Sequence, residues 1–434
     1  MEESNEISIQ NNAELYAQYA YGWLIYTASK KHHFCACYSC ILSLIAMKKG
    51  LNMIDLSKSI DFLLENSGDV IKYRLHKEIL MDISEAEEVA LLEKVMETPK
   101  YELLESYVKP NGYIGIGMHS WDKFKETRLQ DGEAAARLLS NYAIPKDAPI
   151  VANFVRALRN DEVLEEEFSY YNPEIGRFQN RFVGLNCGGG LMVLIYACQA
   201  LLGYGDDEEV IPFVETSYRA FESLLHINSL ADITKVKVLK KGDIRYIESD
   251  TYFPCQYHLE TLAHTNSWRN DESVNTLIRA VNYHDEIMTD AFMNAFSIKD
   301  GNKYNGPLWA YTYPFCAFES CKMTGVTAQR KTLTHLAMIG GDKIDVVRKT
   351  ADFLEDALSQ DGVLRPEFES AYQKRCFKAG LEFPTPYSEI ALEPSHKTDI
   401  ALWCELTFWA VQLLSLVEKR KSMHDGSGTE NFCV

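Results

Sequence analysis

Hydrophobic side chains recur at positions i, i+3, i+4 and i+7 along most of the chain, whereas long stretches that alternate with a period of two are nearly absent. The first pattern lines one face of an α-helix with apolar groups, and the second is typical of half-buried β-strands. The pattern therefore predicts an all-α protein. Short polar turns separate the predicted helices and join them in pairs.

Four helix pairs follow one another, with equivalent turns about 60 residues apart, which is the length of two helices and their connections. The turns contain Pro, Gly, Asp or Asn, which end or cap helices, and Asp147 is placed to cap the helix after the first turn. The predicted pairs cover residues 133–141 and 150–158, 190–202 and 210–225, 256–264 and 274–287, and 309–323 and 328–339. Further helices are predicted at 343–358 and 398–419. We expect repeated helical hairpins arranged as a toroid or barrel.

Other polar segments containing Gly are predicted to end helices, because Gly adopts the positive φ of a helix stop. They cover residues 109–113, 299–302 and 360–364. Segment 233–253 differs, since Val236, Val238, Ile244 and Tyr246 alternate with polar residues around a Lys-Gly-Asp turn. This alternation predicts a small β-like insertion, a hairpin or an extended segment.

The 434 residues could form two or three average domains, but toroids built from repeated units reach this length as one body. We expect a single domain over residues 1–423, with 1–118 forming its N-terminal helices. Residues 424–434 are rich in Gly, Ser and Thr and are expected to be a disordered tail.

Composition narrows the classes of function. Hydrophobic residues make up 46% of the chain, enough for a large core, and the formal charge of −18 argues against a nucleic-acid partner. The N-terminus lacks the basic and apolar regions of a secretory signal, and the longest apolar run, 191–204, is too short to cross a bilayer. We expect a cytoplasmic protein with no transmembrane segment, in which the eleven cysteines are reduced.

The helix pairs and their Asp-Gly or Asn-Gly stops resemble the α/α toroid superfamily of terpene and squalene cyclases and protein prenyltransferase β-subunits. The resemblance extends over roughly residues 120–420. Gln360-Asp361-Gly362 is similar to part of the cyclase repeat, although Val363 or Leu364 stands where that repeat has Trp. The resemblance implies outer and inner helices that alternate around a ring, with the inner helix ends lining a central ligand cavity.

Two catalytic signatures of these families are incomplete here. The Asp-x-Asp-Asp acid of class II terpene cyclases does not occur, and Asp206-Asp207 lies in a predicted turn. The segment from Asp399 to Glu405 is similar to the zinc-binding segment of prenyltransferases, but Leu402 replaces its His. We therefore expect neither zinc-dependent prenyl transfer nor a cofactor.

One cluster could bind a metal ion. It consists of His32, His33, Cys35, Cys37 and Cys40, and thiolate and imidazole groups suit zinc or copper. A zinc module usually has a second paired set of ligands, and here an apolar helix follows instead. Small cysteines packed at a helix start are the favoured interpretation, and metal binding stays open.

Five residues are candidate catalytic groups. Asp250 and His258 lie near the start of a predicted helix, where burial could shift the pKa of an acid or base. The set also contains His284, Asp399 and Cys187, a possible nucleophile next to three glycines at a helix start. Helix capping equally explains the aspartates, a charged helix face explains His284, and tight packing of the helix start explains the glycines.

Six further residues are candidate substrate contacts. Aromatic faces can hold apolar, sugar or cationic groups, and polar side chains can orient them. They are Arg181, Tyr257, Trp309, Tyr313, His396 and Trp403.

Together these features favour a metal-independent enzyme that binds a small or medium organic substrate, such as an isoprenoid or another apolar compound, in a central cavity. Acid–base cyclisation, isomerisation or elimination is the expected chemistry. A carbohydrate-active α/α-barrel hydrolase or lyase is one alternative, and it would use paired acids. The other is a non-catalytic helical-repeat interaction protein. Substrate, reaction and oligomeric state are left open by the sequence.

Overall fold

The computed structural model describes residues 55–118, 131–168, 184–239, 242–288, 297–305, 315–322, 329–368, 391–395 and 397–424. The chain divides into two compact units, Met1–Asp55 and Leu56–Val434, and the described helices and strands all belong to the second. The possible metal ligands at residues 32–40 and the predicted tail from 425 onward lie outside the described residues.

The predicted helical character is confirmed, because the described residues form fourteen α-helices and one small sheet. The helices are α3 (Ser57–Asn66), α4 (Asp69–Arg74), α5 (Glu85–Met96), α6 (Pro99–Glu105), α7 (Gly132–Asn141), α8 (Pro149–Leu158), α9 (Asp161–Phe168), α10 (Leu191–Gln199), α11 (Ile211–Glu222), α12 (Gln256–Ala263), α13 (Asp271–Ile287), α14 (Gln329–Gly340), α15 (Asp345–Leu358) and α17 (Asp399–His424). Single π-helical turns, Leu75–Leu80 and Ala200–Tyr204, extend α4 and α10.

Local capping explains where several of these helices begin. The Asp131 carboxylate accepts a hydrogen bond from Ala134 N at 2.9 Å, and Asn270 caps α13 through Ser273 N in the same way. The predicted cap at Asp147 is wrong. Helix α8 follows Ala148, which makes no side-chain cap, and Pro149 occupies the first turn, where a missing N–H costs nothing.

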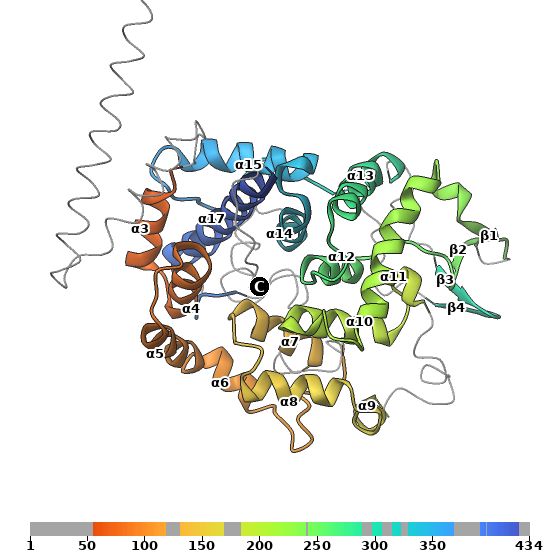
Figure 1. Ribbon diagram of the computed structural model, residues 1–434, viewed down its shortest axis with the longest axis horizontal. Coiled ribbons are helices and arrows are strands. Elements are labelled where there is room, and N and C mark those ends of the chain that lie inside the picture. Colours follow the sequence, from red (N-terminus) through yellow and green to blue (C-terminus); the bar gives the residue numbers. More distant parts are fainter. Residues whose placement is uncertain are drawn as a thin grey trace, which may run out of the picture. The chain divides into compact units, whose positions relative to one another are not determined.

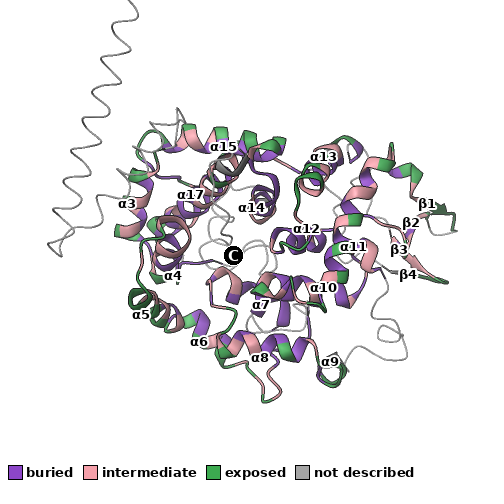
Figure 2. Cartoon of the chain, in the orientation of Figure 1, coloured by how far each residue is buried: buried purple, intermediate pink, exposed green. Residues whose placement is uncertain are grey.

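Five helices form a continuous inner row. Helices α7, α10, α12, α14 and α17 contact one another in chain order, and α8, α11, α13 and α15 pack against them from outside (Figure 1). The inner helices are largely buried, whereas green, exposed faces are concentrated on outer helices such as α5 and α15 (Figure 2). Helix α7 illustrates this, because its residues from Gly132 to Leu139 are all buried.

The predicted β-like insertion is a hairpin of β1 (Lys235–Lys237) and β2 (Ile244–Glu248), which pair in antiparallel fashion. A second hairpin, β3 (Ser297–Asp300) and β4 (Lys303–Asn305), completes the sheet through parallel pairing of β2 with β3. We expected a helix stop at 299–302. This expectation is wrong because Gly301, at φ 55°, lies in the tight turn between β3 and β4.

The predicted helix at 309–323 is wrong over its described part, residues 315–322, which is not helical. Phe318 N donates to the Thr350 hydroxyl at 2.9 Å instead of to a helical carbonyl. Its ring lies edge-on to Trp409, with 4.9 Å between the ring centroids. The aromatic spacing in this segment therefore reflects core packing rather than a helix face.

Helix α17 is the one described helix that is long and apolar enough to cross a membrane, over Asp399–Lys421. In this structure 67% of an 18-residue apolar window in that stretch is buried, and the helix packs against α3, α14 and α15. A central helix of a soluble core has the same length and composition, so this feature is weak evidence for a membrane span.

Candidate active site

A charged face on α7 begins the candidate site. Glu133 and Arg137 are four residues apart and therefore share one side of the helix. Arg137 donates to Glu133 Oε1 from Nε at 3.0 Å and from Nη2 at 2.9 Å. Because α7 belongs to the inner row, this ion pair is buried among helices.

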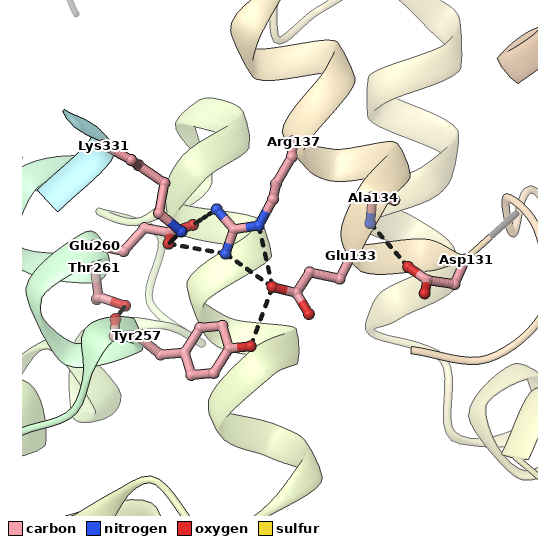
Figure 3. Close-up of polar contacts among 8 residues, drawn as sticks. All are labelled: Asp131, Glu133, Ala134, Arg137, Tyr257, Glu260, Thr261 and Lys331. Atoms are coloured by element: carbon pink, nitrogen blue, oxygen red, sulfur yellow. Dashed lines mark hydrogen bonds and ion pairs between the residues drawn. The ribbon is translucent and has the colours of Figure 1, made fainter. Parts of the chain in front are cut away.

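Helix α12 supplies a second carboxylate and a phenol. Arg137 donates from Nη1 and Nη2 to the two oxygens of Glu260, at 2.9 and 3.0 Å. The Tyr257 hydroxyl donates to Glu133 Oε1 at 3.1 Å. Figure 3 shows the bonds from the Arg137 guanidinium to both carboxylates, so Arg137 holds carboxylates from two different inner helices.

Helix α14 adds an amine and an imidazole. Lys331 Nζ lies 3.5 Å from Glu260 Oε2 on the side opposite Glu133 (Figure 3). One turn further along α14, the His335 ring meets the ring of His264, which directly follows α12, edge-on, with 5.2 Å between the ring centroids. We call Glu133, Arg137, Tyr257, Glu260 and Lys331, with His264 and His335 beside them, the inner charge cluster.

Opposite charges at the centre of the inner charge cluster stabilise the ionised forms of Glu260 and Arg137. Burial would raise the pKa of Glu260, but the positive charge of Arg137, and then of Lys331, lowers it well below its usual range. Burial would likewise lower the pKa of Arg137, but Glu260 and Glu133 raise it instead. The Glu133, Arg137 and Glu260 residues are only 0%, 3% and 1% exposed, so these charges compensate one another inside the protein.

Lys331 differs from the rest of the charged groups. Its side chain is 18% exposed, so it lies at the edge of the cluster. Burial, and then the nearby Arg137 cation, lower its pKa to about 8, against the opposing effect of Glu260. An amine with this pKa can take up and release a proton near neutral pH.

The two histidines are neutral at physiological pH. Burial lowers the pKa of His264 to about 4 and that of His335 well below its usual range, although Glu260 acts in the opposite direction on both. A neutral imidazole can relay a proton between its two ring nitrogens, but a base with a pKa this low is weak. Lys331 is therefore the group of the cluster with a pKa near the working pH.

Of the candidate residues named from the sequence, Tyr257 belongs to the inner charge cluster. His258 lies beside it in sequence, but backbone groups engage both of its ring nitrogens. Nδ1 accepts from Cys255 N at 3.2 Å, and Nε2 donates to Leu185 O at 2.7 Å. Burial lowers its pKa to about 4. His258 therefore joins the segment before α10 to the start of α12.

Cys187 and Asp250 lie together near the sheet rather than in the cluster. The Cys187 thiol is 3.8 Å from Ser249 O, and burial raises its pKa to about 12, which disfavours a thiolate nucleophile. Asp250 is exposed, and its backbone carbonyl accepts from the Asn186 side chain at 2.9 Å. The predicted catalytic set is thus not brought to one place.

The remaining candidates lie on other elements. His284 is buried on α13, where its ring stacks on Phe315 with 4.5 Å between the ring centroids. Asp399 is exposed at the start of α17, and Thr398 caps that helix through Ala401 N at 3.2 Å. The Arg365 guanidinium lies over the Trp403 ring, with its central carbon 4.9 Å from the ring centroid. Arg181, Trp309, Tyr313 and His396 fall outside the described residues.

Sequence reasoning missed six members of the cluster: Glu133, Arg137, Glu260, His264, Lys331 and His335. A signal was nevertheless present. Three pairs spaced by four residues, Glu133/Arg137, Glu260/His264 and Lys331/His335, each place two charged or imidazole groups on the same side of a helical turn. Such pairs on inner helices indicate a shared buried face.

Comparisons with protein-family models, with curated proteins and with solved structures found no match to this chain. Within the described ranges, no three His, Cys, Asp or Glu side chains are grouped so that they could hold a metal ion.

Proposed function

We propose that this protein is an acid–base enzyme of the lyase, isomerase or cyclase type, in which Lys331 carries the proton. The observation that supports this role is the position of Lys331 at the partly exposed edge of a buried ionic cluster. A general base works best when its pKa is near the working pH, and the Lys331 pKa of about 8 meets that condition.

The proposed division of labour follows from the contacts. Arg137 holds Glu133 and Glu260 in place, so the positive charge that disfavours protonation of Lys331 is itself fixed. Tyr257 and the two neutral histidines border the same carboxylates and can donate or relay protons. The substrate would be a small or medium organic molecule bound beside Lys331, and no metal or cofactor takes part in the proposed step.

We further propose that the second unit is an α/α toroid, similar to the terpene cyclase and prenyltransferase superfamily. The consecutive contacts of α7, α10, α12, α14 and α17 support this arrangement. Contacts of α17 with α3 and α4, and a hydrogen bond from the Tyr73 hydroxyl to Ala143 O at 3.4 Å, would close the circuit. In a ring of this kind the cluster would face the central cavity. The proposed location is cytoplasmic, with a small molecule rather than nucleic acid as partner.

A carbohydrate hydrolase receives less support than a lyase. Glycoside hydrolysis requires one carboxyl group that carries a proton at the start of the reaction. Both carboxylates of the cluster instead bind Arg137, and the pKa of Glu260 is lowered. Elimination from a sugar acid needs a base that removes the α-proton and a donor that protonates the departing oxygen, but no protonated carboxyl group. A carbohydrate lyase with Lys331 as the base is therefore compatible with the geometry.

A non-catalytic helical scaffold is the second candidate, and one observation favours it. Glu133, Arg137 and Glu260 are almost fully buried and bind one another, as in ion networks that specify how a core packs. Such a network needs no substrate. The two candidates differ in whether the amine of Lys331 is needed for anything except stability.

A conversion assay distinguishes them. Wild-type protein is incubated with a mixed metabolite extract that contains a metal chelator, and mass spectrometry identifies compounds that change into isomers or elimination products. We expect Lys331→Met to abolish the change and Lys349→Met, at an exposed position on α15, to leave it intact. The rate should rise with pH to a plateau above about pH 8.

Two outcomes would contradict the proposal that the protein is an acid–base enzyme. One is conversion that survives Lys331→Met. The other is a wild-type protein that changes no compound while Lys331→Met lowers only its stability, a result that would favour the scaffold.

A further inference from the structure

We infer that Lys331 forms a covalent imine with its substrate, so that the substrate class is an aldehyde or a ketone. The inference rests on the proposed function, because it gives the amine of the same site a nucleophilic role. It adds the bond that is formed and the functional group that the substrate must carry.

The position of Lys331 suits attack on a carbonyl carbon. Its side chain is partly exposed, whereas Glu133, Arg137 and Glu260 are buried behind it. Its contact with Glu260 measures 3.5 Å, compared with 2.9 and 3.0 Å for the two bonds from Arg137. Glu260 therefore keeps its main partner when the Lys331 nitrogen moves toward a substrate.

The surrounding charges also suit the product. Attack of the neutral amine on the carbonyl gives a carbinolamine, and loss of water from it gives an imine. When the imine is protonated, the nitrogen carries one positive charge, as the ammonium group did before. The ion pairing with Glu260 is thus preserved, and the buried carboxylate never lacks a nearby cation.

The neighbouring imidazoles can move the required protons. The nitrogen must lose a proton as the carbinolamine forms, and the carbinolamine hydroxyl must gain one before it leaves as water, which gives the protonated imine. His335 lies one helical turn from Lys331, and His264 lies one turn from Glu260, with the two rings in contact. Both are neutral at physiological pH, because burial lowers their pKa values.

Lys299 provides a contrast. Hydrogen bonding to Glu248 raises the pKa of Lys299, which favours the unreactive ammonium form. Lys331 instead has a cation, Arg137, beside it, and its pKa is lowered to about 8.

Reductive trapping tests the inference. Full-length protein at neutral pH is mixed with glyoxylate or with butyraldehyde in the presence of cyanoborohydride, a hydride donor that reduces an imine to a stable secondary amine. Modified Lys331 resists trypsin, so trapping yields a peptide spanning Lys331–Lys343 that carries the added mass. We expect Lys331 to be labelled about tenfold or more faster than exposed lysines, because more of its amine is neutral at this pH.

Two variants serve as controls. Lys331→Arg keeps a positive charge beside Glu260 but lacks a nucleophilic amine, and Lys349→Met removes an exposed lysine on α15. The first should lose the labelled peptide, and the second should keep it. Peptide mapping of the wild-type chain needs no variant, so a variant that fails to fold does not prevent the test.

A second measurement separates the two proposals. Competitive acetylation of the wild-type protein over a range of pH values gives the pKa of Lys331 directly. If this pKa is near 8 but neither aldehyde labels Lys331 faster than exposed lysines, the imine is overturned and the acid–base role stands. If the pKa is that of an ordinary lysine, both proposals fail.

Discussion

Arg137 is the residue on which the candidate site depends. One guanidinium binds carboxylates from α7 and α12, and each of the three groups is at most 3% exposed. Taking ions out of water is costly, and here the cost is offset by bonds that pair nearly every donor of Arg137 with a carboxylate oxygen.

Replacement of Arg137 by Met should therefore destabilise the protein strongly. The variant leaves Glu133 and Glu260 buried without their shared cation, and we expect a loss of about 3–5 kcal/mol in the free energy of unfolding. Urea denaturation followed by circular dichroism measures it. Arg348→Met is the matched control, because Arg348 and Asp345 form an exposed pair whose loss should cost about 0–1 kcal/mol. Equal effects of the two substitutions would show that the buried network contributes little.

The lowered pKa of Lys331 predicts a pH dependence of stability. The folded protein binds this proton with a pKa of about 8, whereas the unfolded chain binds it with a pKa near 10.5. Between these values the unfolded state holds more protons, so stability rises as the pH rises from about 8 to 10.5. Relative to Lys331→Met, the wild type should gain on the order of 2–3 kcal/mol over this range. Urea midpoints at pH 7, 8, 9 and 10 measure it, and a constant difference would contradict the lowered pKa.

At the scale of elements, helix positions were predicted well because their causes are local. Asp131 and Asn270 cap helices through their own side chains, and Pro149 begins another. The start of each of these helices can therefore be predicted from the residues next to it in the sequence. The segment at 315–322 was misassigned because its aromatics bind distant partners such as Thr350 and Trp409. Local spacing cannot distinguish a helix face from such long-range packing.

Contacts between helices that are far apart in the sequence also explain why most of the inner charge cluster was not predicted. The sequence shows that Glu133 and Arg137 share a helix face, but not that Glu260 lies opposite them, 123 residues away. His258 was chosen because it stands at a helix start, yet its ring nitrogens bind backbone atoms of Cys255 and Leu185. Pairing between helices decides both cases, and no local pattern encodes it.

His258 should accordingly be a structural residue. We expect His258→Leu to lose about 2–3 kcal/mol of stability, because it removes two hydrogen bonds and leaves the buried Cys255 N–H and the half-buried Leu185 carbonyl without these partners. Below the melting temperature of the variant, conversion in the metabolite assay should stay within about twofold of the wild type. A large loss of rate in fully folded variant protein would restore His258 as a catalytic candidate.

Gly188 gives a second test of the contact between the segment before α10 and the start of α12. Gly188 has φ 78°, and a Cβ added there would lie 2.7 Å from the Cys255 sulfur. We expect Gly188→Ala to destabilise the protein by about 3 kcal/mol or more, because backbone strain and a steric clash add. Gly301→Ala is the control, since Gly301 also has positive φ but nothing lies within 4 Å of the added carbon, and only about 1–2 kcal/mol of strain is expected. Thermal unfolding of both variants provides the comparison.

At the scale of the whole second unit, the core depends on contacts between distant parts of the chain. Lys100 donates to two carbonyls that lie 291 and 293 residues further along the sequence. Glu393 accepts a hydrogen bond from Gly68 N at 2.7 Å, across 325 residues. These links fix the segment before α17 against α4 and α6, and composition or periodicity alone could not have predicted them.

The packing of α17 against α3 has a consequence for synthesis of the protein. Helix α3 is the first described helix and α17 the last, so the partner that covers one side of α3 leaves the ribosome more than three hundred residues later. At 5–20 residues per second this interval lasts tens of seconds, during which the apolar faces meant for α17 lack their cover. The nascent chain is thus a natural client for chaperones, and a stalled or truncated product that lacks α17 is prone to aggregation.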